Sequence, residues 1–370
     1  MTATFSLAVD AMGGDRAPAM VVSGLEVAAE RHPEARFLLV GDAAKVAPLL
    51  ARQRRASAAC TLRHAPDAIG DDMKPTAALR ARQSSMRIAI DAVAAGEVSG
   101  VVSAGNTGAL LALTKVVLKT LPGIDRPAMA AIGPSARGDV VMLDLGANVQ
   151  CDVRNLVQFA IMGDVFARTV LGLTAPSIGL LNVGSEELKG DDVLRQAADI
   201  LRASHIGPQF KGFVEGHDIA AGTTDVVVTD GFTGNVALKT AEGALRLIFD
   251  LLRQVFSSTW SGRLAYLLAR PGLERLREWL DPRRYNGAVM VGLNGVVVKS
   301  HGGADAETFA HAVDVAMDMV VHRFNDLIRQ DLARSGLDKP VAADKNGRES
   351  GGARVATQAA APLISDRTGS

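Results

Sequence analysis

The stretch Phe5-Ser-Leu-Ala-Val-Asp-Ala-Met-Gly-Gly-Asp15 decides the fold. It is an apolar, β-prone run that ends in two glycines, and Pro18–Arg31 follows it with helical spacing. Pro18 suits a first helical turn, where its missing N–H is not needed. A strand that ends in glycines before a helix presents backbone N–H groups and the positive end of the helix dipole, which together favour an anion the size of phosphate.

Similar turns recur four times, so the sequence predicts a repeated strand–turn organisation, in most cases continued by a helix. The further turns are Ser103-Ala-Gly-Asn-Thr-Gly108, Asp144-Leu-Gly-Ala-Asn148, Asn182-Val-Gly-Ser185 and Asp230-Gly-Phe-Thr-Gly-Asn235. Open α/β sheets bind ligands at the carboxyl ends of their strands, so we expect several of these turns to meet at one sheet edge in a polar pocket. Any single turn is also explained by backbone geometry, because Gly and Asn tolerate positive φ.

Short apolar runs alternate with segments of helical period, which indicates an α/β fold. The runs are continuously apolar, as expected for strands covered by helices on both faces. Asn294-Gly295 between Val289–Leu293 and Val296–Ser300 predicts a hairpin, which adds an antiparallel component. The other predicted strands are Phe5–Ala11, Arg36–Gly41, Thr61–His64, Gly100–Ser103, Met129–Gly133, Val140–Leu145, Ser177–Val183, Phe210–Glu215 and Val226–Thr229. The predicted helices are Pro18–Arg31, Ala77–Ala95, Gly108–Lys119, Arg154–Leu171, Val193–Ala203, Val236–Phe256 and Asp305–Ala333.

Bulk properties narrow the class of protein. We expect one α/β domain over residues 1–336 and a disordered tail over 337–370, where Gly, Ala, Ser and charges dominate without periodicity. The formal net charge is zero and aromatics make up 4%, which argues against a nucleic-acid partner. Two cysteines without a Cys-x-x-Cys pair are typical of a reduced cytoplasmic protein. Without a leader-like start or a membrane-length apolar run, we expect a soluble or peripheral protein.

Several common site motifs are absent from the sequence. No two glycines are separated by a single residue, which excludes the G-x-G-x-x-G dinucleotide fingerprint. The chain also lacks a P-loop, an H-E-x-x-H zinc pair and a G-x-S-x-G nucleophile elbow. The sequence therefore predicts anion binding with no cofactor and no metal.

Polar residues in the turns have two readings each. Asn106, Asn148 and Asn235 follow glycines near helix starts, where they either cap the helix or donate an amide to a ligand. Asp10, Asp144 and Asp230 lie at or next to the ends of predicted strands, where a lone Asp is usually a cap and a group of three suggests a pocket. Lys189 is the best point charge for a phosphate, and a solvated loop lysine is the equal alternative.

Taken in order, the motifs of the chain resemble the PlsX family of phosphate acyltransferases. They are Val9-Asp-Ala-Met-Gly-Gly-Asp15, Ser103-Ala-Gly-Asn-Thr-Gly-Ala109, Arg126-Pro-Ala128, Asp144-Leu-Gly-Ala-Asn148, Gln158-Phe-Ala-Ile-Met-Gly163, Gly179-Leu-Leu-Asn-Val-Gly184, Gly212-Phe-Val-Glu-Gly216 and Asp230-Gly-Phe-Thr-Gly-Asn235. The resemblance runs from about Leu7 to Arg329. The chain departs from it at Cys151-Asp-Val153, where the family often has Cys-Lys-Pro, and at Val289, where a proline is expected.

The resemblance implies a three-layer α/β/α, Rossmann-like sandwich with a mixed, mostly parallel sheet, akin to phosphotransacetylases and isopropylmalate dehydrogenases. It also implies a homodimer that transfers an acyl group from acyl carrier protein to inorganic phosphate. The acyl phosphate would serve phospholipid synthesis, through the membrane glycerol-3-phosphate acyltransferase that uses it. An acyl-CoA phosphotransacetylase and a non-catalytic peripheral scaffold are the alternatives.

For this reaction we expect Lys189, Asn235 and Asp230 to be catalytic, with an Asn amide facing the thioester carbonyl. Backbone N–H groups of three turns would hold the phosphate. The residues expected at the phosphate and substrate are Asp10, Gly13, Gly14, Gly105, Asn106, Thr107, Gly108, Asp144, Asn148, Gly231, Thr233 and Gly234.

A segment of the chain combines aromatic residues with arginines. Both tryptophans and both tyrosines fall between Trp260 and Tyr285, and between residues 253 and 284 seven arginines face three acidic residues. We expect an amphipathic helical hairpin over about 253–285 that protrudes and meets an anionic membrane surface or an acidic carrier protein. A packed hairpin at a dimer interface is the alternative. The expected contact residues are Trp260, Arg263, Leu264, Leu267, Leu268 and Arg270. The expected location is the cytoplasm, with peripheral association to the inner face of the cell membrane.

Overall fold

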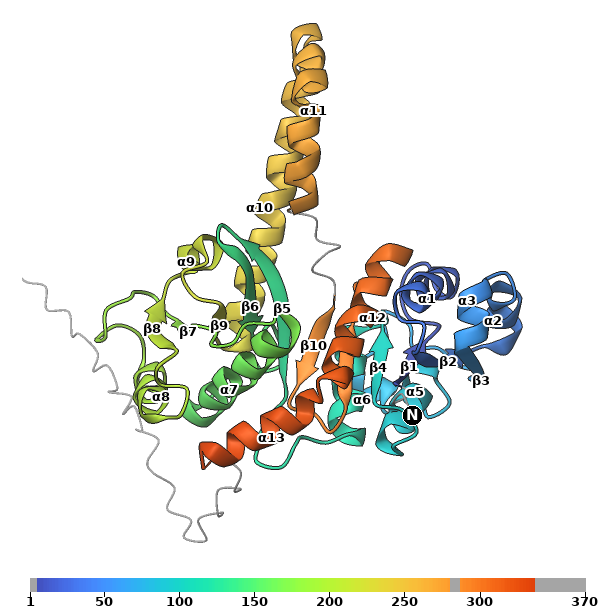
Figure 1. Ribbon diagram of the computed structural model, residues 1–370, viewed down its shortest axis with the longest axis horizontal. Coiled ribbons are helices and arrows are strands. Elements are labelled where there is room, and N and C mark those ends of the chain that lie inside the picture. Colours follow the sequence, from blue (N-terminus) through green and yellow to red (C-terminus); the bar gives the residue numbers. More distant parts are fainter. Residues whose placement is uncertain (1–4, 280–286, 337–370) are drawn as a thin grey trace, which may run out of the picture. The chain divides into compact units, whose positions relative to one another are not determined.

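The computed structural model describes residues 5–279 and 287–336. The predicted disordered tail and the last residues of the predicted hairpin, 280–285, lie outside the described residues. Within these, one sheet has the strand order β3-β2-β1-β4-β11-β10-β5-β6-β9-β7-β8 (Figure 1). The strands are β1 Ser6–Asp10, β2 Arg36–Gly41, β3 Cys60–His64, β4 Gly100–Ser103, β5 Ala128–Ser135, β6 Gly138–Leu143, β7 Ile178–Leu181, β8 Phe210–Val214, β9 Val226–Val228, β10 Ala288–Val291 and β11 Val296–Lys299.

The sheet consists of two parallel halves that run in opposite directions. β3, β2, β1, β4 and β11 are parallel to one another, and so are β6, β9, β7 and β8. Between the halves, β10 is antiparallel to both β11 and β5, and β5 is antiparallel to β6. The Asn294-Gly295 hairpin is therefore confirmed, and it supplies the centre of the sheet rather than an edge.

Helices cover both faces of the sheet, which makes three layers (Figure 1). The helices are α1 Ala19–Arg31, α2 Ala43–Leu50, α3 Arg54–Ala59, α4 Pro75–Ala78, α5 Ser85–Ala94, α6 Thr107–Val117, α7 Val153–Val170, α8 Asp192–Ala203, α9 Gly216–Ala221, α10 Gly231–Ser258, α11 Trp260–Trp279, α12 Ala306–Val321 and α13 Phe324–Arg334. On one face, α1, α7, α8 and α12 pack in one cluster with alternate strand residues such as Val9 and Leu143. On the other face, α5 and α6 pack with Ala8, and α10 packs with Met142. Strands buried on both faces explain the continuous apolar runs.

Two predicted long helices are interrupted. The segment predicted as Ala77–Ala95 is divided into α4 and α5, because the Ser84 side chain accepts from the N–H of Arg87 and starts a new helix. The segment predicted as Asp305–Ala333 is divided into α12 and α13 at Arg323, which takes the left-handed conformation with φ of 54°. Apolar periodicity continues across both breaks and so conceals them.

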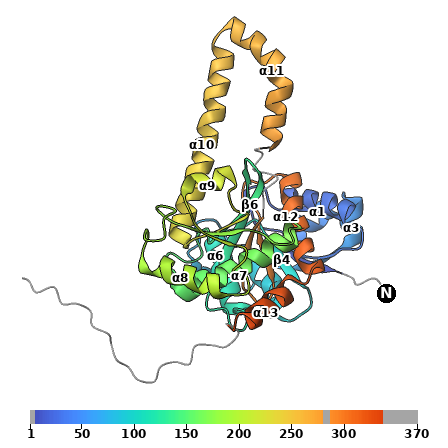
Figure 2. The ribbon, with the colours of Figure 1, turned by 60° about the vertical axis from the view of Figure 1, so that its left-hand side comes forward.

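Helices α10 and α11 run in opposite directions and meet at the tip where they are joined (Figure 2). The rings of Phe256 and Tyr266 meet edge-on with centroids 5.7 Å apart. The first of the two helices begins at Gly231, five residues before the predicted start, because the Asp230 side chain caps it. Among the described residues no helix is long and apolar enough to cross a membrane.

Candidate active site

The reversal between the two halves of the sheet separates the Gly-rich turns. We name the carboxyl ends of β1, β4 and β11 the first edge, and those of β6, β9 and β7 the second edge. β10 ends beside Ala128, where β5 starts, and β11 starts beside Gly100, where β4 starts. The second edge therefore lies at the amino ends of β1 and β4. Several turns meet at each edge, as expected, but the expectation that Gly13-Gly14, Gly105–Gly108 and Gly231–Asn235 hold one phosphate together is wrong, because the sequence did not reveal the antiparallel pairing of β5.

At the second edge, Asp144 uses the turn's own donors. Its buried carboxylate accepts from the backbone N–H groups of Met129, Gly146, Ala147 and Asn148, at 2.7–3.2 Å, and from the Asn148 side-chain amide at 2.9 Å. A carboxylate that accepts several N–H bonds is itself the anion of this turn. These donors are already occupied by Asp144. The hydrogen bonds of Asp144 and Asn148 therefore hold the turn together and leave no donor of these groups for a ligand.

The Asp230 turn is also closed by internal contacts. The Asp230 carboxylate accepts from the N–H and the hydroxyl of Thr233, at 2.9 and 2.7 Å, and so caps α10. Gly231 donates to Asn148 O at 2.7 Å, and Gly234 donates to Asp230 O at 2.9 Å. A Cβ on Gly234 would lie 2.0 Å from Asp144 O, so this glycine allows close approach of two backbones.

Two predicted residues at the second edge remain exposed. The side-chain amide of Asn235 has no hydrogen-bond partner among the described residues. Lys189 is 53% exposed and its Nζ lies 3.1 Å from Glu186, three residues earlier in the same loop. An exposed ion pair of this kind contributes little to stability. The second edge thus offers the Asn235 amide, the solvated Lys189 ammonium, and the N–H groups of Gly184, Ser185 and Phe232, which have no acceptor among the described residues.

At the first edge, Asp10 is buried at the end of β1. Its carboxylate accepts from the hydroxyls of Ser85 at 2.6 Å and Ser103 at 2.7 Å, and from the N–H of Met12 at 3.2 Å. Burial raises the pKa of Asp10, and these hydrogen bonds only partly oppose the shift. The side chain ties β1, β4 and α5 together at this edge.

Five backbone N–H groups at the first edge are unoccupied among the described residues, in contrast to those of the Asp144 turn at the second edge. The N–H groups of Gly13, Gly14, Asn106, Thr107 and Gly108 have no acceptor within residues 5–279 and 287–336. The Asp10 and Ser103 turns are in contact. A Cβ added at Gly13 would lie only 2.5 Å from the backbone nitrogen of Gly105, so the two backbones approach too closely for a side chain. Gly14 has a φ of 102°, and a Cβ added there would lie 3.1 Å from Ala104 Cβ and from Gly302 O. One continuous contact surface therefore carries donors from two turns.

Asn106 is a cap and a clamp. Its Oδ1 accepts from Ala109 N at 3.0 Å and starts α6. Its Nδ2 donates to Asp71 O at 2.6 Å and to Met73 O at 3.2 Å, which holds the loop 70–73 against the start of α6. The Asn106 side chain was expected either to cap the helix or to donate its amide to a ligand, and in the structure it caps α6.

Lys299 is a first-edge residue that sequence analysis missed. It ends β11 and is only 9% exposed. Its Nζ donates to Ala104 O at 3.3 Å and to Ser300 O. Burial lowers the pKa of the ammonium to about 8. The signal was a lysine directly after Val296-Val-Val298, where a continuous strand pattern turns polar.

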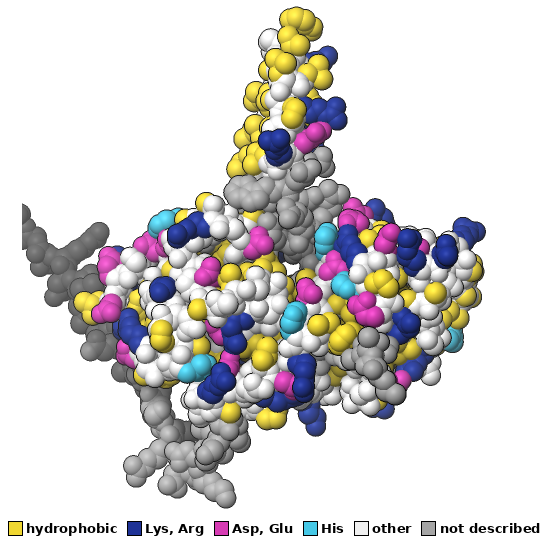
Figure 3. All heavy atoms as spheres, viewed as in Figure 1, with side chains coloured by type: hydrophobic (Ala, Val, Ile, Leu, Met, Phe, Trp, Pro, Cys, Tyr) yellow, Lys and Arg dark blue, Asp and Glu magenta, His cyan; other side chains and the backbone are white. Residues whose placement is uncertain are grey.

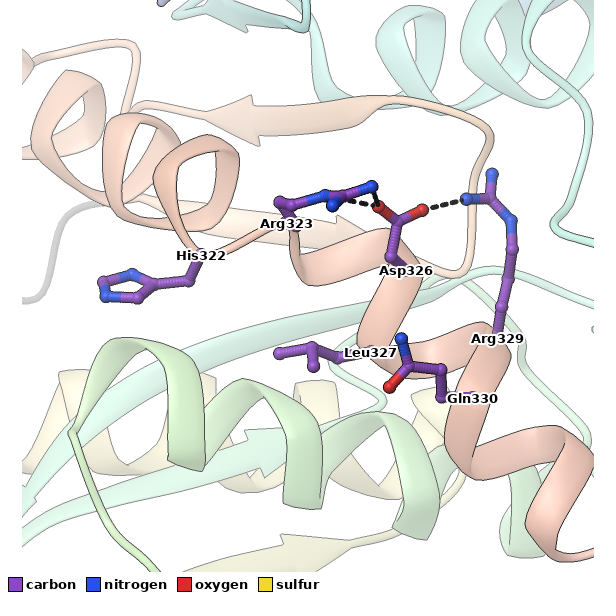
Figure 4. Close-up of a pocket in the computed structure, with 6 residues that line it drawn as sticks. All are labelled: His322, Arg323, Asp326, Leu327, Arg329 and Gln330. Carbon is purple, nitrogen blue, oxygen red and sulfur yellow. Dashed lines mark hydrogen bonds and ion pairs between the residues drawn. The ribbon is translucent and has the colours of Figure 1, made fainter. Parts of the chain in front are cut away.

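An open hollow of about 380 Å³ lies at the junction of α12 and α13 (Figure 4). Asp326 pairs with Arg323 and Arg329 there, at 2.7 Å in each case. The charged side chains Arg323, Asp326 and Arg329 of this hollow pair with one another. None of the predicted site residues lines the hollow. We therefore do not place the chemistry in this hollow.

The α10–α11 pair exposes apolar side chains alongside basic ones (Figure 3). Trp260 is 80% and Leu268 79% exposed, and Leu264 and Leu267 are exposed too. Arg263 is exposed, and Arg270 pairs with Glu274 at 2.7 Å. An exposed apolar surface of this kind marks an interaction site.

Comparisons with known proteins agree with this fold. The model of a family described as "Fatty acid synthesis protein" matches residues 5–327. A phosphate acyltransferase of Granulibacter bethesdensis is 71% identical over 93% of this chain and 94% of its own length. One of Acidiphilium cryptum is also 71% identical, over 91% and 89%.

Solved structures of low identity share the architecture. A phosphotransacetylase of Streptococcus pyogenes superimposes with a TM-score of 0.59 at 16% identity, over 86% of this chain and 94% of its own. The EutD phosphotransacetylase of Staphylococcus aureus gives 0.56 at 14% identity, over the same shares. At these identities the likeness shows the fold, which confirms the predicted α/β/α sandwich. The chain is an enzyme and belongs to the PlsX family of phosphate acyltransferases, matched by the fatty acid synthesis protein model.

Proposed function

We propose that this enzyme transfers a fatty acyl group from the thioester of acyl carrier protein to inorganic phosphate. Relatives at 71% identity are named phosphate acyltransferases, which supports phosphate as the acceptor. The family description points to fatty acid metabolism, which supports a fatty acyl donor. The product is an acyl phosphate for phospholipid synthesis, to be used by the membrane glycerol-3-phosphate acyltransferase.

The reaction needs positioning more than it needs a reactive side chain. A phosphate oxygen attacks the thioester carbonyl, a C–O bond forms, the C–S bond breaks, and the thiolate leaves and takes up a proton. Phosphate is already an anionic nucleophile and a thiolate is a competent leaving group. Alignment of the two reactants can contribute about 7–11 kcal/mol, and one donor to the developing oxyanion about 2.7–4 kcal/mol.

We place the phosphate at the first edge. The observation that carries this placement is the set of unoccupied backbone donors at Gly13, Gly14, Asn106, Thr107 and Gly108. N–H groups at glycine turns and at the start of an eleven-residue helix suit an oxyanion. In the Asp144 and Asp230 turns of the second edge, the N–H groups of Gly146, Ala147, Asn148 and Thr233 bind these two carboxylates instead.

The rival placement puts the phosphate at the second edge with Lys189, Asn235 and Asp230 as catalytic residues. It is favoured by the Asn235 amide, which is exposed and has no partner among the described residues. The two placements exclude each other within one chain, because the edges lie at opposite ends of the strands.

The α10–α11 pair supplies the proposed contact with carrier protein or membrane. After the pair the described chain resumes at Gly287, and Ala288 pairs with Lys299 at the first edge. An acyl donor received on this pair would thus be close in sequence to the proposed phosphate site. We propose that the enzyme is a cytoplasmic homodimer that associates peripherally with the anionic inner face of the cell membrane.

One assay separates the candidate functions. The pure protein is mixed with phosphate and either acyl carrier protein thioester or acyl-CoA, and acyl phosphate is trapped with hydroxylamine. We expect product with the carrier protein thioester. Product with acyl-CoA alone would identify an acyl-CoA phosphotransacetylase, and no product with either donor would favour the non-catalytic scaffold.

A further inference from the structure

The buried ammonium of Lys299 has no direct counter-ion within residues 5–279 and 287–336. Its two hydrogen bonds go to the neutral carbonyls of Ala104 and Ser300. Among the residues that the structure describes, no carboxylate oxygen lies within 4.0 Å of Nζ. Lysine is almost never this buried unless it is paired, because an isolated charge loses its hydration. A buried cation whose described partners are all neutral indicates an anion that comes from outside the chain.

The surrounding carboxylates are poor substitutes for that anion. Burial lowers the pKa of Lys299, while Asp71, Asp10 and Asp15, in that order, act to raise it. Asp10 is bound by two serine hydroxyls and a backbone N–H, and burial raises its own pKa. Asp71 and Asp15 are exposed to solvent. None of the three forms an ion pair with Lys299.

Asp71 is held near Lys299 through the Ser103 turn. Asn106 binds Asp71 O at 2.6 Å, and Ala104, two residues before Asn106, binds Lys299 Nζ at 3.3 Å. The loop 70–73 is otherwise exposed at all positions but Met73. It therefore places one carboxylate in the field of the buried ammonium, and because this carboxylate is exposed to solvent another anion can replace it there.

We propose that Lys299 is a phosphate-binding residue of this enzyme and that Asp71 is the anion with which phosphate competes. The inference rests on the proposed function and names the charged group of its phosphate site. A lysine suits this role as a compact point charge. Phosphate brings more charge to Nζ than one exposed carboxylate does, so binding displaces Asp71 from the field of Lys299.

The first test compares two neighbouring exposed carboxylates. We expect D71N to lower the Kd for inorganic phosphate about 1.5- to fivefold, the worth of one exposed charge pair. D72N is the matched control, because Asp72 is exposed in the same loop and is not one of the three carboxylates that raise the pKa of Lys299. Isothermal titration of the full chain with phosphate gives both values. Equal Kd values for D71N and D72N would overturn the role of Asp71.

The second test removes the ammonium. We expect K299M to raise the KM for phosphate about 10- to 150-fold, the value of a charged hydrogen bond, with the KM for the acyl donor unchanged and K299R affected less. K211M, at an exposed lysine of β8, is the control. A folded K299M with the phosphate KM of the wild type would refute the proposal. If urea unfolding shows that K299M is not folded, the D71N and D72N pair decides.

The wild-type protein separates this inference from the function on which it rests. If the wild type neither binds phosphate nor forms acyl phosphate, the proposed function fails. If it does both and the Lys299 and Asp71 variants behave as their controls, the function stands and the role of Lys299 fails.

Discussion

Replacement of Asp144 by alanine tests whether the second-edge turn is a structural unit. The substitution removes the acceptor of five hydrogen bonds, four from backbone N–H groups and one from the Asn148 amide. At about 1 kcal/mol net for each bond, the sum is about 5 kcal/mol. Partial relaxation lowers this figure, so we expect D144A to lose about 3–5 kcal/mol of unfolding free energy.

The measurement is urea unfolding followed by circular dichroism at one fixed protein concentration, because association would add to apparent stability. D230A is the control. It removes a helix cap with one backbone and one hydroxyl donor, and we expect it to cost about 1 kcal/mol. A D144A variant no less stable than D230A, with the same m-value, would show that these five bonds do not hold the turn.

Three other predictions follow from the described contacts. We expect K189A and N235A to keep turnover within about twofold of the wild type, since a lost contact to the transition state would cost at least tenfold; loss of activity in both folded variants would move the phosphate to the second edge. Replacing Leu267 and Leu268 with Glu should abolish flotation with anionic liposomes, and unchanged flotation would exclude the α10–α11 pair as the contact. Burial raises the pKa of Asp164, which Arg168 only partly opposes. The cost of ionising it is therefore relieved as the pH falls from neutral toward 3.8. The unfolding free energy of the wild type should rise relative to D164N over that range, and a pH-independent difference would contradict the shift.

Local signals predicted most elements, and long-range pairing was beyond their reach. The strand predicted before Gly13-Gly14 and the hairpin predicted at Asn294-Gly295 are both present in the structure. Such features can be predicted because neighbouring residues encode strand endings and hairpins. The β5–β6 hairpin carries Ala136-Arg137 at its turn, without a strong turn signal, so its antiparallel pairing was missed. That single omission moved the Asp144 turn to the wrong edge.

The candidate site was predictable only in part for a related reason. The sequence indicates where backbone donors occur, but it does not show which acceptor they bind. Asp144 binds the donors of its own turn, whereas Asp10 turns to Ser85 and Ser103 and leaves Gly13 and Gly14 unoccupied. Lys299 was missed because its burial depends on β4 and on the Ser103 turn, far away in the chain.

The position of β10 and β11 has a consequence for biosynthesis on the ribosome. These two strands are made last, yet they join β4 to β5 in the middle of the sheet. Until Lys299 has left the exit tunnel, the segments before and after Leu118 can assemble only as two separate half-sheets, each with an exposed edge. Nascent chains stalled before this point should be aggregation-prone, and release of a further dozen residues should protect both edges at once.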